Sequence, residues 1–306
     1  MKKKTSKFER QRTVTGAIFL LPVLLFVAFF VIWPLIRVVA LSFTDWNGVS
    51  KTYNFIGLEN YRNLTDIEGF WDMCKATVIF SVCVTILTIV VSFLVALILD
   101  KKGPWRINRG LMRSLWFFPC LLSGTVVGIL WRIMYNYNNG VLNTIITSIT
   151  GARRGVNWLE SPQFTIYAVV VACVWASLGM CIVIFLAGLQ SIDGSLYEAA
   201  EIDGATPAQQ LFHITWPMMA PSVTINVLTT SIAAFKMYEL PLNVSNGGPG
   251  YKSTLITKEI YSLGFDYAGH PGMGGKGAAL SVVLIVIIAV ISLIELIYMR
   301  NREDIY

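Results

Sequence analysis

The chain has 306 residues, of which 55% are hydrophobic and 14% are charged, and its mean hydropathy is +0.62. This composition excludes an ordinary soluble domain of the same length, in which about a quarter of the residues carry a charge. The net charge of +6 does not indicate a nucleic-acid-binding protein, because the basic residues form no face on a soluble domain.

Six apolar runs are long enough to cross a membrane, since about 20 helical residues span roughly 30 Å of hydrocarbon. The predicted spans are Gly16 to Ala40, Cys74 to Leu99, Arg113 to Met134, Gln163 to Leu189, Pro221 to Leu242 and Ala278 to Met299. We therefore predict an all-α polytopic membrane protein with six transmembrane helices, made of a basic tail (1-15) and one membrane domain (16-306). The basic start is also typical of a signal peptide, but the apolar run is too long and no small-residue cleavage site follows it.

The positions of Lys and Arg predict the orientation. Thirteen of the 24 basic residues lie in the N-terminal tail, the loop after the second span and the C-terminus, whereas eight are spread over the loops of the other side. Because cytoplasmic loops are enriched in Lys and Arg, both termini are predicted to be cytoplasmic.

Between the fourth and fifth spans lies a polar segment, Ser195 to Pro217, which reads SLYEAAEIDGATPAQQLFHITWP. Ser195 and Glu198 have the spacing of a capping box, so a short helix is predicted to begin at Ser195. Gly204 can end that helix in the left-handed conformation. The segment contains no Lys or Arg although it is predicted to be cytoplasmic, which favours a protein partner.

A second short helix is predicted to begin directly after Gly204. Thr206, Pro207 and Gln209 fit the positions N-cap, N1 and N3. Pro217 and Pro221 limit how far this helix can run. The expected result is two helices bent at a glycine.

This segment resembles the EAA loop of bacterial ABC importer permeases, and we call it the EAA segment. The family pattern is met by Glu198, Ala199, Ala200, Gly204, Ile214 and Pro217, with Trp216 where leucine is usual. The resemblance implies that a coupling loop (190-220) docks onto a separate ATPase subunit. The residues implied in this coupling are Glu198, Ala199, Ala200, Asp203, Gly204, Ile214 and Pro217. The plainer reading, in which Glu198 only caps a helix and Gly204 only ends one, is compatible with that role.

Two outer motifs extend the resemblance over most of the chain, to the family that contains the maltose and glycerol-phosphate permeases. Phe55 to Leu64, FIGLENYRNL, is similar to the first external loop of such sugar permeases, although an aromatic interfacial loop would look the same. Ser245 to Pro249, SNGGP, stands where the family has Thr-x-Gly-Gly-Pro. In the third span, Gly124 and Gly128 form a small-xxx-small pair that allows close helix contact.

The resemblance also implies a substrate path. Trp175, Ser177 and Met180 can share a face of the fourth span. On the fifth span, Thr230, Ala234 and Met237 form one stripe, with Tyr238 close to it. Two aromatic residues, Trp175 and Tyr238, would suit the apolar faces of sugar rings. Ordinary packing is the alternative for each of these residues, since hydroxyls also bond to their own helix.

Catalysis and nucleotide binding have little support. Lys276 is followed by Gly277 where a phosphate loop needs Ser or Thr. His213 and His270 are predicted on opposite sides of the membrane, and the five cysteines are interpreted as packing residues. Lys236 and Glu239 have a spacing that permits an ion pair, but one pair near an interface is too little to support a proton relay. No cofactor is expected in this chain, so ATP and Mg²⁺ are expected on a partner ATPase.

The sequence therefore predicts a non-catalytic permease subunit of an ATP-driven importer in the bacterial cytoplasmic membrane. It would form half of the path for a sugar or oligosaccharide, together with a second permease of different sequence, an ATPase dimer and an extracytoplasmic substrate-binding protein. Alternatives are a permease for a polyol or glycerol phosphate, and an ion-coupled secondary transporter, whose marks would be membrane carboxylates or an inverted repeat.

Overall fold

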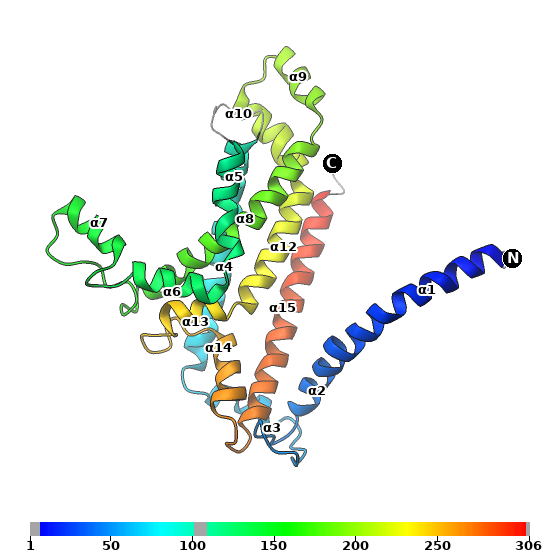
Figure 1. Cartoon of the computed structure of the whole chain (residues 1–306), viewed down its shortest axis with the longest axis vertical. Coiled ribbons are helices and arrows are strands. Elements are labelled where there is room, and N and C mark those ends of the chain that lie inside the picture. Colours follow the sequence, from blue (N-terminus) through cyan, green and yellow to red (C-terminus); the bar gives the residue numbers. More distant parts are fainter. Residues whose placement is uncertain (1–6, 101–108, 304–306) are drawn as a thin grey trace. The chain divides into compact units, whose positions relative to one another are not determined.

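The computed structural model describes residues 7–100 and 109–303. The basic residues Lys2, Lys3, Lys4, Lys101, Lys102 and Arg106, on which part of the orientation depends, lie outside these ranges. Within these ranges the regular elements are helices, and the one β-type pairing is an isolated bridge between Thr44 and Phe55. The predicted all-α fold is therefore confirmed (Figure 1). The chain divides into two compact units, Met1–Leu64 with Ile260–Val283, and Thr65–Glu259 with Leu284–Tyr306.

The first unit begins with a long apolar helical stretch. It consists of α1 (Lys7–Val27), a π-helical turn η1 (Ala28–Ile32) and α2 (Trp33–Leu41). The helix begins at Lys7, ahead of the start predicted at Gly16. Its apolar part, Ile18–Leu41, has 24 residues and a most hydrophobic window with none of its residues buried.

The predicted external motif lies in the same unit, around α3 (Glu59–Arg62) and η2 (Asn63–Asp66). Asn60 is buried, and its side-chain amide donates to the carbonyls of Ser42 and Thr44 at 2.9 and 2.8 Å. Gly275 lies against the Thr44 carbonyl, which a Cβ at this position would strike. The small residues before the last span therefore allow close contact with this loop.

The second unit is built around α8 (Thr165–Ser191), which packs against α4 (Phe70–Leu99) and α12 (Ala220–Lys236). In its most hydrophobic window 61% of the residues of α8 are buried, compared with 39% for α4 and 11% for α15 (Met273–Glu303), so α8 is the central helix. The remaining helices are α5 (Arg109–Phe117), η3 (Phe118–Leu121), α6 (Gly124–Met134), α7 (Val141–Thr150), α9 (Gly194–Ile202), α10 (Pro207–Gln210), η4 (Leu211–Thr215), α11 (Trp216–Met218), α13 (Glu239–Ser245), α14 (Ile256–Tyr261) and η5 (Ser262–Asp266), the last of which belongs to the first unit.

Four helices of the described residues are long and apolar enough to cross a membrane: Ile18–Leu41, Phe70–Leu99, Thr165–Ser191 and Met273–Met299. Two further candidates are bent pairs, Gly110–Leu121 with Gly124–Met134 at 101°, and Pro207–Met218 with Ala220–Lys236 at 63°. The count of six spans therefore holds if each bent pair is one span.

The third span was predicted as one helix from Arg113 to Met134, and this is wrong. Pro119 lies in the 3-10 turn η3, and Leu122 and Ser123 are extended. The Ser123 hydroxyl then accepts the Val126 N–H at 3.3 Å and starts α6 afresh. A proline and a new N-cap break the helix even though the apolar run continues.

The fifth span was predicted to run unbroken to Leu242, and this is also wrong. Helix α12 ends at Lys236, Met237 is extended, and α13 begins at Glu239. The helical spacing that would bring Lys236 and Glu239 together is therefore lost. By contrast, the close contact predicted for Gly124 and Gly128 is confirmed, because a Cβ at Gly128 would lie 3.0 Å from the Leu240 carbonyl of α13.

Candidate functional site

The EAA segment folds into two short helices, as its sequence predicts, but α9 starts differently. The N-cap of α9 is Asp193, whose side chain accepts the Ser195 N–H at 2.9 Å. The capping box predicted for Ser195 and Glu198 is therefore not formed. The carboxylate of Asp193, two residues before Ser195, caps the helix instead. The side chain of Glu198 is exposed.

Gly204 ends α9 as predicted. Its φ is +77°, in the left-handed region, and its N–H bonds to the Glu201 carbonyl at 3.1 Å. The Ala205 N–H reaches back to the Ala200 carbonyl at 2.8 Å. These two bonds form a Schellman motif, which satisfies carbonyls at the helix end and turns the chain.

The second helix, α10, begins with Thr206 at the predicted N-cap position, and Thr206 and Gln209 form a capping box. The Thr206 N–H donates to Gln209 Oε1 at 2.7 Å, and the Gln209 N–H donates to the Thr206 hydroxyl. Pro207 occupies the first helical position. A π-helical turn, η4, and α11 continue the segment. The helix is interrupted at Met219, and α12 then begins with Pro221 in its first turn.

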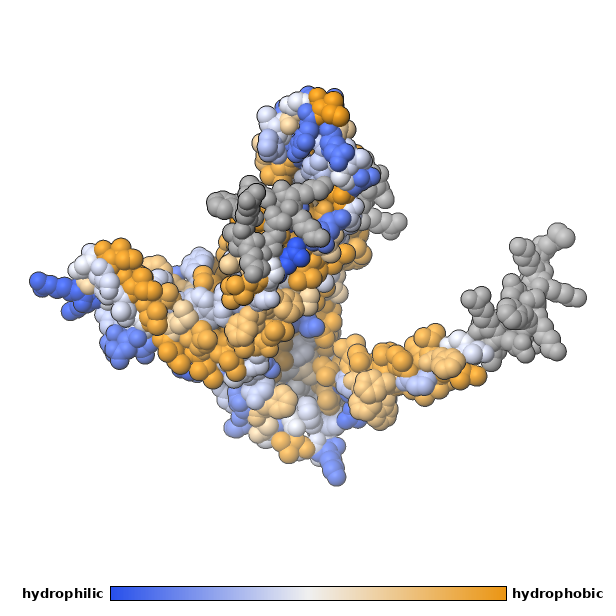
Figure 2. All heavy atoms as spheres, turned by 45° about the horizontal axis from the view of Figure 1, so that its top comes forward, coloured by the Kyte–Doolittle hydropathy of each residue, from blue (hydrophilic) through white to orange (hydrophobic). Residues whose placement is uncertain are grey.

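The tip of this segment carries apolar side chains in the open. Ile202 is 87% exposed and Phe212 66%, and the polar residues that follow them in the chain, Asp203 and His213, are exposed as well. Figure 2 shows this mixture of hydrophobic and hydrophilic surface at the end of the molecule that is turned forward. Both side chains are therefore accessible to a partner that binds this segment.

The base of the segment is anchored to the helices of the second unit. The hydroxyls of Tyr197 and Thr215 are 2.8 Å apart and link α9 to η4. The Trp216 ring packs edge-on against Phe93 of α4, with centroids 5.3 Å apart. Ile214 is half-buried against the core, and Pro217 lies at the start of α11. The base of the segment therefore contacts α4 and leads through Met219 directly into α12.

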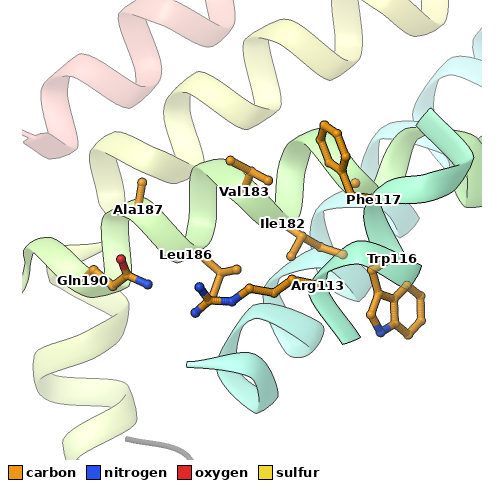
Figure 3. Close-up of a pocket in the computed structure, with 9 residues that line it drawn as sticks. Arg113, Trp116, Phe117, Ile182, Val183, Leu186, Ala187 and Gln190 are labelled. Carbon is orange, nitrogen blue, oxygen red and sulfur yellow. The ribbon is translucent and has the colours of Figure 1, made fainter. Parts of the chain in front are cut away.

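A cavity of about 240 Å³ lies near the end of α8, between α8 and α5 (Figure 3). Arg113 of α5 and Gln190 of α8 are its polar lining residues. Arg113 donates to the Leu99 carbonyl at the end of α4 at 3.4 Å, whereas its Nε is buried without a partner. Arg113 thus links the end of α4 to the middle of α5, close to where the EAA segment leaves α8.

A second cavity, of about 380 Å³, lies farther along α8 and α12, and we call it the α8–α12 cavity. It is lined by Val84, Cys120, Ala176, Ser177, Met180, Cys181, Thr229, Thr230, Ala233, Ala234 and Met237. Five of the seven residues predicted for the substrate path, Ser177, Met180, Thr230, Ala234 and Met237, therefore line one space. Met237 reaches it from the extended break after α12 and not from a helical stripe.

The two aromatic residues of that prediction do not line the α8–α12 cavity. Trp175 packs edge-on against Trp131 of α6, with ring centroids 5.9 Å apart. Tyr238 is the N-cap residue of α13. The polar groups that face the cavity are hydroxyls instead, and those of Ser177 and Thr229 also bond to carbonyls of their own helices. Thr230 contacts Cys181 Sγ at 3.4 Å and so joins α12 to α8.

Sequence reasoning missed an interaction between α12 and α15. The Ser231 hydroxyl lies 2.8 Å from the Glu295 carboxylate, beside a cavity of about 450 Å³ between α4, α12 and α15. The Ser81 hydroxyl, which lines the same cavity, is buried without a partner. The signal that would have found this site is the single carboxylate within the apolar run ISLIELIYM, because charged side chains in membrane spans are rare and usually functional.

The outer motif SNGGP forms a compact turn after α13. Asn246 and Gly247 both have positive φ, and the Gly247 carbonyl accepts a hydrogen bond from the Thr254 hydroxyl at 2.9 Å. The Ser245 hydroxyl lies 2.9 Å from that of Ser253, so the serine that replaces threonine keeps its hydroxyl in use. Lys258 donates to the Asn246 carbonyl at 2.9 Å and closes the turn.

Comparison with known proteins identifies the family. Residues 106–301, more than half of the chain, match the family described as binding-protein-dependent transport system inner membrane component. The chain is 32% identical over 272 residues to the trehalose/maltose transport system permease protein MalF of Thermococcus litoralis, covering 86% of this chain and 88% of that protein. It is 31% identical over 248 residues to the probable starch degradation products transport system permease protein AmyD of Thermoanaerobacterium thermosulfurigenes, covering 81% and 82%.

A solved structure has the same fold. A chain of the bacterial alginate ABC transporter, in complex with alginate pentasaccharide-bound periplasmic protein, superimposes with a TM-score of 0.82 over 96% of both chains, at 22% identity. The multi-helix architecture and the family match agree with the EAA segment and with the apolar spans. The chain therefore belongs to the inner membrane components of binding-protein-dependent transport systems, the multi-pass permease subunits of ABC importers.

Proposed function

We propose that this chain forms one half of the translocation path for a sugar or oligosaccharide. A second permease of different sequence would form the other half, and an extracytoplasmic binding protein would deliver the solute. ATP and Mg²⁺ would bind to a separate ATPase dimer that docks onto the EAA segment. The observation that carries this proposal is the exposed tip of the EAA segment, whose helices are capped and whose base is anchored on the helices that line the α8–α12 cavity.

The coupling role follows from how the segment is built. Caps and a Schellman turn hold α9 and α10 in one conformation, so little freedom is lost when a partner binds the tip. Ile202 and Phe212 offer apolar anchors, and Glu198 and Asp203 offer charges around them. Motion of a docked ATPase would move Trp216 against α4, and α12 with it.

The substrate path follows from the α8–α12 cavity. Its volume lies within the range of about 300 to 1,000 Å³ that is usual for small-molecule sites. Its hydroxyls from Ser177, Thr229 and Thr230 can exchange hydrogen bonds with sugar hydroxyls, while Met180 and Met237 offer apolar surface. The named solutes of the relatives, trehalose, maltose and starch degradation products, support a saccharide. A polyol or glycerol phosphate is the alternative solute.

The orientation follows from the same proposal. The ATPase is cytoplasmic, so the EAA segment and, with six crossings, both termini would lie on the cytoplasmic side. This agrees with the Lys and Arg distribution of the sequence.

The test uses the complex of this chain with its partner permease, ATPase and binding protein in liposomes. Changing Ile202 to Glu places a charge at the tip without disturbing the fold, because the side chain is 87% exposed. We expect at least a tenfold loss of ATP-dependent uptake and of substrate-stimulated ATP hydrolysis. Val49→Glu, at a position that is 69% exposed in another loop, is the matched control and should retain both.

Uptake would be measured with labelled maltose, trehalose, lactose, glycerol and glycerol 3-phosphate. Uptake of a saccharide supports the proposed substrate class, whereas uptake restricted to glycerol or its phosphate would replace it with the alternative. Full activity of Ile202→Glu, or uptake that an ionophore abolishes while ATP is present, would contradict ATPase coupling through this segment.

A further inference from the structure

Helix α7 (Val141–Thr150) is a ten-residue apolar helix in the connection between α6 and α8. Ten helical residues measure about 15 Å, half of the roughly 30 Å needed to cross the hydrocarbon. The helix therefore does not span a membrane, and its exposed apolar face needs another explanation.

That face is a stripe of three residues at helical spacing. Val141, Ile145 and Ile149 are 52%, 50% and 80% exposed, and residues four apart lie on one side of a helix. Figure 2 shows hydrophobic residues in a band along the arm that Figure 1 labels α6 and α7. The exposed Ile129 and Ile133 of α6 belong to the same arm.

The orientation of α7 is held by a buried asparagine on its other side. Asn143 Nδ2 donates to the carbonyls of Asn136, Tyr137 and Val156 at 3.0 to 3.3 Å. Asn143 Oδ1 accepts the Val156 N–H at 2.9 Å and the Trp158 Nε1–H at 3.0 Å. These hydrogen bonds hold the Asn143 side of α7 against the connection and leave the apolar stripe on the opposite side exposed.

The polar side chains of α7 are already satisfied within the helix. The hydroxyls of Thr144, Thr147, Ser148 and Thr150 bond to the carbonyls of Gly140, Asn143, Thr144 and Ile146 at 2.7 to 3.1 Å. Polar groups without hydrogen-bond partners are costly in a membrane. A helix whose hydroxyls already bond to its own carbonyls therefore has a small free-energy cost of entering the lipid.

Two arginines follow directly after the helix. Gly151 ends α7 with φ +68°, and Arg153 and Arg154 come next with exposed side chains. In the described residues, neither arginine forms an ion pair. An apolar stripe with arginines at its end is complementary to a phospholipid surface, in which acyl chains lie beneath phosphates.

We propose that α7 is an interfacial anchor, which lays Val141, Ile145 and Ile149 into the bilayer while Arg153 and Arg154 bind lipid phosphates. The anchor would hold the connection between α6 and α8 against the membrane surface. Fixed at that surface, the arm would also hold α6, and α13 packed against it, at a constant depth in the bilayer.

The test places a photoreactive amino acid at position 149, or at the exposed position 144 about 140° around the helix as control. The permease complex is reconstituted in vesicles of phosphatidylethanolamine and phosphatidylglycerol, with and without the binding protein, and adducts are identified by mass spectrometry. We expect lipid adducts at position 149 to exceed those at position 144 by at least fivefold. Equal labelling at the two positions, or protein adducts in place of lipid at 149, would overturn the proposal.

The arginines are tested in the same vesicles. Arg153→Glu with Arg154→Glu should lower lipid labelling at position 149 several-fold, and Arg153→Lys with Arg154→Lys should restore it. The matched control, Asn138→Glu with Asn139→Glu at the other end of the helix, should leave labelling unchanged. Equal lipid labelling in the Glu and Lys variants of Arg153 and Arg154 would contradict the role of these two positive charges. Gel filtration of each variant before reconstitution confirms that the complex is intact.

Discussion

The EAA segment and the α8–α12 cavity belong to the same unit but are shaped by different kinds of contact. In the segment, the bonds that set the helix ends join residues two to five positions apart, as between Asp193 and Ser195 or Ala200 and Ala205. In the cavity, the contacts join residues far apart in the chain, as between Cys181 and Thr230. Substitutions in the segment should therefore leave the stability of the helix bundle nearly unchanged. Substitutions at the helix contacts around the cavity should lower the stability of the whole bundle.

The largest effect is expected where α8 lies close to the backbone of α5, at the cavity of about 240 Å³ in the same unit. A Cβ at Gly179 of α8 would lie 3.0 Å from Phe117 Cα and 3.1 Å from Cys120 Sγ. Gly179→Leu should therefore lower the free energy of unfolding by about 2 to 3 kcal/mol. In detergent this would appear as a fall in the thermal midpoint of roughly 5 °C or more. Val183→Leu, on a more exposed part of α8, is the control, and equal midpoints for the two variants would contradict the packing argument.

A smaller effect is expected on the opposite face of α12, where Ser231 meets Glu295. Ser231→Ala removes the donor to a half-buried carboxylate and should cost about 1.5 kcal/mol of stability. Ser231→Thr keeps the hydroxyl and should cost less. The double variant with Glu295→Ala checks the pair, because additive losses from the two single changes would mean that Ser231 and Glu295 do not interact.

Within the EAA segment, the turn at Gly204 should be the most sensitive point. A β-branched residue at φ +77° is strained, so Gly204→Val should cost about 1 to 2 kcal/mol in local stability. Hydrogen exchange at Ala205 should accelerate and coupled ATP hydrolysis should fall, while the thermal midpoint stays within a degree or two. Gly204→Asn should retain most activity, since asparagine tolerates this conformation. A large fall in the midpoint would show that the segment is not locally determined.

The smallest effect is expected at the cap of α10. Thr206→Ala removes the hydroxyl that accepts the Gln209 N–H and should cost about 1 kcal/mol. Exchange of the amides from Ala208 to Phe212 should then quicken roughly fivefold. Thr206→Ser preserves the hydroxyl and serves as the control. Exchange rates that do not change in the alanine variant would mean that Pro207 and the following π-helical turn hold the helix alone.

Sequence reasoning succeeded where structure depends on a few neighbouring residues. The end of α9 at Gly204 and the positions of Thr206 and Gln209 at the start of α10 were predicted correctly, because caps are chosen by side chains within one helical turn. The start of α9 was misjudged for the same reason: Asp193 and Ser195 are both capable caps, and the geometry selects the aspartate. Long apolar runs likewise identified the membrane helices, since a helix that crosses the bilayer needs about 20 consecutive apolar residues.

Tertiary structure alone decided the breaks and the lining of the cavity. Hydropathy does not register the turn at Pro119 to Ser123, because it lies inside an apolar run, and the charges beside Met237 do not by themselves indicate that this residue is extended. Helical spacing placed Ser177 and Met180 on one face, but only the packing of α6 against α8 turns Trp175 away toward Trp131. Likewise, Glu295 and Ser231 lie 64 positions apart, and no local pattern pairs them. The sequence by itself thus determined which segments enter the membrane and how the EAA segment turns. Packing between distant helices decided which side chains meet, since such contacts depend on shapes that only the folded bundle brings together.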